Sequence, residues 1–225
     1  MTGQTPPNDT PNADLLAILP KVERLVEVGC STGALARAYR SRHPEAHWIG
    51  IEIDDDYAAA ARRYCQEVFI GDIEQLLHDP SATPSLQAEC WIFGDCLEHL
   101  RDPWQVLRRV YSLLPAGGTV CACIPNVQHW SLQARLCLGA FNYEDSGLLD
   151  RTHLRWFTAS SMAHLFESSG FQIKQQHPRI FPHPKAAQAL DQIHRFAEGL
   201  GGDPDQAVRA ARPYQFIVEA IKIGA

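Results

Sequence analysis

Short apolar runs recur along the chain, separated by segments with helical periodicity. A short apolar run between turn signals is typical of a buried strand, whereas apolar residues three and four positions apart are typical of a helix. The runs predict strands at 25–28, 46–53, 67–70, 90–93, 119–124, 171–175 and 215–223. The periodicity predicts helices at 14–19, 34–40, 57–64, 102–114, 158–170 and 185–200. This alternation predicts an α/β fold in which helices cover both faces of a doubly wound, mostly parallel seven-stranded sheet.

One segment, residues 126–157, interrupts the alternation and is rich in His, Arg and aromatic side chains. We expect this segment to form an insertion that supplies the wall or lid of a substrate site. Residues 1–12 are polar and contain three prolines, and we expect a flexible tail there. With 225 residues, 45% of them hydrophobic, the chain can build one good core, so we predict a single domain over 1–225.

Charge, hydropathy and cysteine content limit the possible partners and the cellular compartment. The net charge is −6 and no block of Lys or Arg stands out, which disfavours a nucleic-acid partner. No apolar run approaches the length that spans a bilayer, so we expect no membrane partner. The seven cysteines form no C-x-x-C pair, and this indicates reduced thiols in a cytoplasmic protein.

The first predicted strand runs into a glycine turn, and a helix follows at once. Glu27 precedes the turn, which has the form Gly29-x-x-x-Gly33. Glycines permit a sharp turn and a close approach of a ligand, while the free N–H groups of a helix start favour an anionic group. The dinucleotide pattern G-x-G-x-x-G is absent because position 31 is Ser, and no Lys completes a P-loop.

Acidic residues follow at the ends of the next three strands. Glu52 lies nineteen residues after Gly33, and Asp72 and Asp95 end the third and fourth strands. In a parallel sheet of this type, ligands bind outside the carboxyl ends of the strands, where an acid at this spacing accepts hydrogen bonds from ribose hydroxyls. The three acids behind a glycine turn therefore predict a nucleoside-containing cofactor.

The ordered motifs resemble those of class I S-adenosylmethionine (SAM)-dependent methyltransferases, most closely the broad group with quinone-biosynthesis and glycan-associated enzymes. The motifs are Glu27-Val-Gly-Cys-Ser-Thr-Gly33, Gly50-Ile-Glu52, Gly71-Asp72, Asp95-Cys-Leu-Glu98-His99 and Leu114-Pro-Ala-Gly-Gly118. The resemblance implies a Rossmann-like fold, SAM as methyl donor and S-adenosylhomocysteine as product. It implies cofactor contacts from Glu27, Gly29, Cys30, Ser31, Gly33, Glu52, Ile53, Asp72, Ile73, Asp95, Cys96 and Leu97. By this resemblance Glu52 binds the ribose, and Asp95 to Leu97 line the methyl-donor end.

The acceptor side is expected within the interrupting segment. The candidate acceptor-binding residues are Asn126, His129, Trp130, Arg151, His153 and Arg155. Arg side chains suit a carboxylate or phosphate, so we predict a small polar or anionic acceptor. The aromatic residues of the segment are also accounted for by packing on the sheet.

We predict methyl transfer to an oxygen or nitrogen atom, driven mainly by positioning and exclusion of water. A hydroxyl acceptor also needs a general base, for which His99, His129 and His153 are the candidates. A SAM-binding module without catalysis and an enzyme that methylates a protein or nucleic acid stay open as alternatives. A nicotinamide dehydrogenase is a more distant one, and a homodimer is compatible with the sequence.

The pattern Asp95-x-x-Glu98-His99, with the later His153, raises the question of a metal. It resembles the Glu-x-x-Glu-His motif of metal-dependent small-RNA and quinone-biosynthesis O-methyltransferases. Two carboxylates and two imidazoles could hold a divalent cation. Asp95 is one methylene shorter than the first Glu, and many related enzymes with this turn have no known metal. We therefore expect metal-independent transfer, with His99 or His153 near the acceptor.

Overall fold

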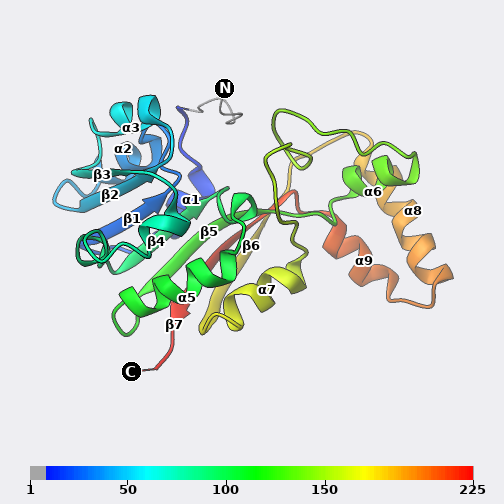
Figure 1. Cartoon of the computed structure of the whole chain (residues 1–225). Coiled ribbons are helices and arrows are strands. Elements are labelled where there is room, and N and C mark those ends of the chain that lie inside the picture. Colours follow the sequence, from blue (N-terminus) through cyan, green and yellow to red (C-terminus); the bar gives the residue numbers. More distant parts are fainter. Residues whose placement is uncertain (1–8, 225) are drawn as a thin grey trace.

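The computed structural model describes residues 9–224, and a seven-stranded sheet forms its centre (Figure 1). The strands are β1 (Arg24–Val28), β2 (His47–Glu52), β3 (Glu67–Ile70), β4 (Cys90–Gly94), β5 (Thr119–Pro125), β6 (Phe171–Arg179) and β7 (Gln215–Lys222). Their order across the sheet is β3-β2-β1-β4-β5-β7-β6. Neighbours among β1 to β5 are parallel, and β7 runs antiparallel to both β5 and β6. The predicted fold class is confirmed.

Helices cover both faces of the sheet. They are α1 (Ala13–Ile18), α2 (Ala34–Arg40), α3 (Asp55–Ala61), α4 (Ile73–Leu76), α5 (Pro103–Leu113), α6 (Trp130–Cys137), α7 (Ala159–Glu167), α8 (Ala186–Gly199) and α9 (Pro204–Ala211), with short 3-10 turns at Thr83–Leu86 and Leu97–His99. Successive side chains of a strand point to opposite faces, so each strand feeds two cores. Val26 packs into the core under α4, α5 and α7, and its neighbour Leu25 packs into the core under α1, α2 and α3. The sheet is thus doubly wound.

Local capping explains where several helices begin. Asp102 accepts a hydrogen bond from the N–H of Gln105, and Pro103 occupies the first turn, as the sequence predicts. Helix α3 begins at Asp55, ahead of the predicted start at 57, because the Asp54 carboxylate accepts the free N–H groups of the first turn. The sequence analysis does not predict helix α9, because this helix has only eight residues and Val208 is its only large aliphatic side chain.

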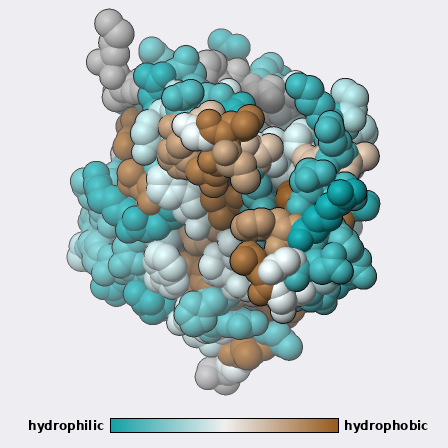
Figure 2. All heavy atoms as spheres, turned by 90° about the vertical axis from the view of Figure 1, so that its right-hand side faces the viewer, coloured by the Kyte–Doolittle hydropathy of each residue, from teal (hydrophilic) through white to brown (hydrophobic). Residues whose placement is uncertain are grey.

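Helices α6, α8 and α9 lie together at one end of the molecule, and we call them the helical lobe (Figure 1). Helix α6 belongs to the predicted insertion, whereas α8 and α9 follow β6 in the chain. Asn126 is fully buried and ties the lobe to the end of β5, because its side-chain amide donates to the carbonyls of Ala210 and Pro213, both at 2.8 Å. Figure 2 shows this end of the molecule, where hydrophobic residues lie among hydrophilic ones.

The predicted tail over 1–12 lies partly within the described residues. Residues 1–8 lie outside the described residues, whereas Asp9 and Asn12 are held in place. Asp9 pairs with Arg37 of α2 at 3.3 Å, and Asn12 caps the start of α1. Asp9 and Asn12 are thus bonded to the folded part, and a flexible tail over 1–12 stays a prediction.

Within residues 9–224, every helix is too short or too polar to cross a membrane.

Candidate active site

The glycine turn after β1 has the backbone shape that its sequence requires. Gly29 and Gly33 have φ values of +70° and +82°, in the region that favours glycine. A Cβ on Gly33 would lie 3.2 Å from Tyr64 and from the backbone of Ala61, so packing also disfavours a side chain there. Ser31 has a φ of 47°, an uncommon value for a residue other than glycine. The turn therefore keeps a strained loop close to the carboxyl end of β1.

Glu52 ends β2 and fastens this loop from the other side. Its carboxylate accepts the N–H of Ser31 at 2.8 Å, the N–H of Ile53 at 2.8 Å and the N–H of Asp54 at 3.1 Å. The side chain is buried. One carboxylate thus orders both loops that border the predicted ribose position, and it does so with charge-assisted bonds.

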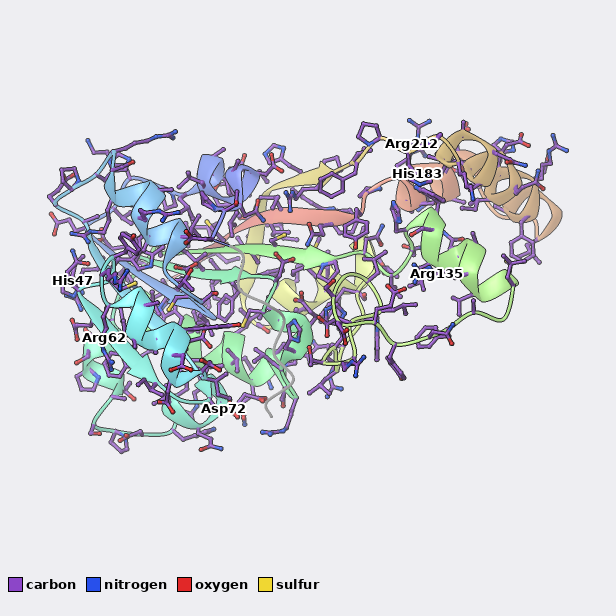
Figure 3. All side chains as sticks on the ribbon, turned by 90° about the horizontal axis from the view of Figure 1, so that it is seen from above. His47, Arg62, Asp72, Arg135, His183 and Arg212 are labelled. Carbon is purple, nitrogen blue, oxygen red and sulfur yellow. The ribbon has the colours of Figure 1, made fainter. Side chains whose placement is uncertain are left out.

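A cavity of about 440 Å³ opens beside these two loops. This volume lies within the range of roughly 300–1000 Å³ for small-molecule sites. Its lining includes Gly29 of the turn, and Asp95 and Cys96 directly after β4. The lining also contains Ile53, whose side chain is 59% exposed, and Asp72. In Figure 3, Asp72 lies well away from Arg135 of α6, which marks the helical lobe.

Most of the predicted cofactor residues line this cavity. They are Gly29, Ser31, Glu52, Ile53, Asp72, Ile73, Asp95 and Cys96. The remaining four lie behind the wall: Glu27, Cys30, Gly33 and Leu97 are not among the lining residues. Glu27 accepts a hydrogen bond from the indole of Trp48 at 3.0 Å, and burial raises the pKa of its carboxyl well above the usual range. Their role as direct cofactor contacts stays a prediction.

The arrangement fits SAM, which carries a charged methionine part and an adenine whose flat ring faces pack on apolar side chains. The exposed Ile53 side chain offers the adenine an apolar surface, and Glu52 borders the same wall. The absence of side chains at Gly29 leaves the backbone open, since a Cβ there would meet nothing nearer than Cys96 at 3.8 Å. The residues present therefore suit a nucleoside with a charged tail.

Asp95, at the end of β4, is joined to strands that the sequence did not connect with it. It accepts hydrogen bonds from the Cys123 thiol at 3.3 Å and from the Gln215 amide. Gln215 in turn accepts from Arg179 at 2.6 Å, and Arg179 also pairs with Asp14 at 2.7 Å. Asp95 is exposed on one side, but desolvation by the surrounding protein raises its pKa to about 6, although the cysteine hydrogen bond opposes the shift.

His99 lies on the cavity wall and is bonded to the predicted insertion. Its Nδ1 lies 2.9 Å from the hydroxyl oxygen of Thr152, and this hydroxyl donates to the Asp150 carboxylate at 2.6 Å. Burial lowers the pKa of His99, while the charge of Asp150 opposes the shift. The imidazole is therefore neutral near neutral pH. Sequence reasoning missed Thr152 and Asp150, because nothing local relates them to a residue more than fifty positions earlier.

Glu98 and His153 meet behind His99. The Glu98 carboxylate is 1% exposed, and its Oε2 has no hydrogen-bond partner among the described residues. Its Oε1 lies 4.0 Å from Nε2 of His153. Burial raises the pKa of Glu98 well above the usual range and lowers that of His153 to about 4. Together with His99 they form a group whose candidate metal-ligand atoms lie within 4.8 Å of one another.

The predicted acceptor residues are spread over a wider area than the cavity. Asn126, His129, Trp130, Arg151, His153 and Arg155 are all absent from its lining. His129 caps α6, and Arg151 pairs with Asp145 at 2.6 Å. The guanidinium that lines the cavity is that of Arg101, whose side chain lies 3.4 Å from Asp72. Of the insertion, Thr152 and Leu154 reach the cavity. An acceptor-binding role for the six predicted residues stays a prediction.

Comparison with known proteins decides the family. A family model described as a methyltransferase domain matches residues 9–176. This chain belongs to the class I SAM-dependent methyltransferases. A search of curated proteins found no match.

Solved structures share the fold of this methyltransferase. A SAM-dependent methyltransferase from Thermotoga maritima is 18% identical, with a TM-score of 0.60, and the match covers 93% of this chain and 86% of that one. A SAM-dependent methyltransferase from Archaeoglobus fulgidus is 15% identical, with a TM-score of 0.61, and the match covers 93% and 90% of the two chains. An O-methyltransferase from neocarzinostatin biosynthesis, solved with S-adenosylhomocysteine and 1,4-dihydroxy-2-naphthoic acid, is 16% identical, with a TM-score of 0.56 and coverages of 94% and 53%.

Proposed function

We propose that this methyltransferase transfers a methyl group from SAM to an oxygen or nitrogen atom of a small polar or anionic acceptor. The observation that carries the proposal is the position of His99 on the same cavity wall as Asp95 and Cys96. By the family resemblance these two residues border the methyl-donor end. An imidazole that is neutral near neutral pH can accept the proton of a hydroxyl acceptor there.

The other residues of the cavity wall each bind a different part of SAM in this proposal. Glu52 holds the ribose while keeping both neighbouring loops ordered. Gly29 and Ser31 contribute backbone to the methionine part, and Ile53 packs on the adenine. When bound, SAM supplies the electrophilic methyl group. Because the reaction needs no covalent intermediate on the protein, the residues act by positioning the reactants and excluding water.

Arg101 supports the anionic character of the acceptor. Its side chain borders the cavity and pairs with Asp72 at 3.4 Å and with Glu74 at 3.8 Å, but it is 73% exposed, so its guanidinium can also bind a carboxylate or phosphate. Arg151 is engaged by Asp145, and Arg155 donates to the carbonyls of Leu154 and Arg101. Recruitment of either arginine to an acceptor would require those contacts to open.

The alternative acceptors are less well supported. A net charge of −6 disfavours a nucleic-acid substrate. A SAM-binding module without catalysis gives no account of a histidine whose ring nitrogen is fixed at the cavity wall. The similar structures include a candidate histamine N-methyltransferase and O-methyltransferases, so both acceptor atoms stay in the proposal. Free thiols at the described cysteines support a reducing compartment such as the cytoplasm.

A transfer assay with isotopically labelled SAM tests the proposal. The acceptors are hydroxylated carboxylic acids, sugar nucleotides and amines, each assayed with and without EDTA. We expect SAM-dependent labelling of at least one small acceptor, insensitivity to EDTA, and loss of about a hundredfold or more of kcat in His99→Gln. Labelling of protein or RNA alone would refute the small-molecule acceptor, and activity that requires an added divalent cation would refute metal-independent transfer.

A further inference from the structure

The hydrogen bonds of His99 define which of its ring nitrogens carries the proton. Nδ1 lies 3.3 Å from the carbonyl oxygen of Thr152, and a carbonyl can only accept. Nδ1 also lies 2.9 Å from the Thr152 hydroxyl. The hydrogen of that hydroxyl is already donated to Asp150, so the hydroxyl too is an acceptor toward the ring. Both contacts require Nδ1 to be the donor, and the neutral ring therefore carries its free lone pair on Nε2.

The acceptors of this proton are themselves held rigidly. Asp150 is 3% exposed, and its carboxylate also accepts the backbone N–H of Thr152 at 2.8 Å. The next residues are fastened to the turn that carries the imidazole. The carbonyl of Glu98 accepts the N–H groups of Leu154 at 2.8 Å and of Arg155 at 2.9 Å. The segment over 150–155 is therefore locked against His99 by both side-chain and backbone bonds.

We propose that Thr152 and Asp150 are positioning residues that hold His99 in the tautomer with Nδ1 protonated, so that Nε2 is the base for the acceptor. This inference rests on the proposed function and specifies how its base is prepared. Neither residue touches the reacting atoms; both act through the imidazole.

With a hydroxyl acceptor, the reaction transfers a methyl group from SAM and a proton to His99. The acceptor oxygen forms a bond to the methyl carbon as the carbon–sulfur bond of SAM breaks, and the electron pair of that bond stays on sulfur in S-adenosylhomocysteine. The hydroxyl proton moves to Nε2 of His99. The ring becomes an imidazolium, whose charge is stabilised through the Thr152 hydroxyl by Asp150. Proton release to solvent then restores the base.

Nitrogen NMR tests the tautomer without any acceptor. Histidine-labelled protein is saturated with S-adenosylhomocysteine at pH 8, and the His99 signals are assigned with His99→Gln. Two-bond nitrogen–proton correlations report which nitrogen is protonated. We expect Nδ1–H in the wild type and in Thr152→Ser, and an increased share of Nε2–H in Thr152→Val. Nε2–H as the main form of the wild type would overturn the inference, as would a tautomer ratio that Thr152→Val leaves unchanged.

Kinetics with an acceptor found in the transfer assay provide a second readout. Loss of one hydrogen bond predicts that Thr152→Val lowers kcat about tenfold with little change in the KM for SAM, and that Thr152→Ser restores it. Thr83→Val is the matched control, because the Thr83 hydroxyl donates to Asp79 far from His99. An unchanged kcat in Thr152→Val overturns the inference even where the proposed function holds. Failure of the wild type to methylate any acceptor refutes the proposed function, while the NMR result still decides the tautomer.

Discussion

Replacement of Glu52 by Gln separates the loop-ordering role of this carboxylate from its role toward SAM. The variant keeps the shape of the side chain but has one accepting oxygen in place of two. In the structure, Oε2 accepts from Ser31 while Oε1 accepts from Ile53 and Asp54. Whichever way the new amide turns, its NH₂ group faces at least one backbone N–H. The glycine turn or the loop after β2 must therefore lose its partner.

The size of the effect follows from the kind of bond that is lost. A hydrogen bond to a charged group contributes roughly 1.5–3 kcal/mol, and the same range applies to a ribose hydroxyl bound to the carboxylate. Loss of about 2 kcal/mol corresponds to roughly thirtyfold weaker binding. We therefore expect the Kd for SAM to rise about thirtyfold in Glu52→Gln and further in Glu52→Ala, which removes both oxygens.

Isothermal titration calorimetry with SAM and with S-adenosylhomocysteine measures this change in Kd. Thermal unfolding without ligand measures how much stability the protein loses when the two loops lose their hydrogen bonds to Glu52. Glu67→Gln is the control, because Glu67 bonds His47 at the outer strand and lies outside the cavity. A folded Glu52→Gln protein that binds SAM within twofold of the wild type would refute the ribose role. A loss of affinity in Glu67→Gln of the same size would show that the effect is not specific to the cavity.

Three further outcomes follow from packing and burial. Gly50→Ala should destabilise the fold by about 1–3 kcal/mol, because the new Cβ would lie 2.6 Å from the Cys30 thiol; chemical unfolding checks this, and added Cys30→Ala should restore part of the loss. Burial, with repulsion from His183, lowers the pKa of His129 to about 4, so its contribution to stability is lost as pH falls from about 6.5 toward 4. His129→Asn retains a capping side chain and should flatten that loss by about 2 kcal/mol, whereas an unchanged pH dependence would contradict the assignment. Desolvation raises the pKa of Asp95 from 3.8 to about 6, so stability falls as pH rises through this window. Because Asp95 is exposed to solvent, which screens the effect, Asp95→Asn should be more stable than the wild type by only about 1 kcal/mol at pH 8 and no different below pH 4, as measured by denaturant titration.

The sheet and most of the cofactor wall could be predicted because their signals are local. Strand burial follows from apolar runs, and the positive φ at Gly29 follows from a turn that only glycine adopts without strain. Glu52 was identifiable because its distance from the turn is set by one helix and one strand. Such features need only the residues beside them.

The residues on the acceptor side could not be predicted from local sequence signals, because polar side chains there have partners far away in the sequence. Asn126 looks like a ligand in the sequence, yet its amide is used by two carbonyls more than eighty positions later. Arg151 is taken up by Asp145 at 2.6 Å, and Arg101, which lines the cavity, stands in a turn without any special pattern. The contact between the Thr152 hydroxyl and His99 exists only in the folded chain, so no local pattern in the sequence indicates it.

The position of β7 has a consequence for synthesis of the protein. This strand comes after α8 and α9 in the chain, yet it lies between β5 and β6. Strands β1 to β5 can pair as they leave the ribosome, but β6 has to wait for residues 215–222 before it joins them. Until then the edges of both β5 and β6 are unpaired, and such edges are templates for aggregation. A chain truncated before residue 215 would therefore keep these unpaired edges exposed.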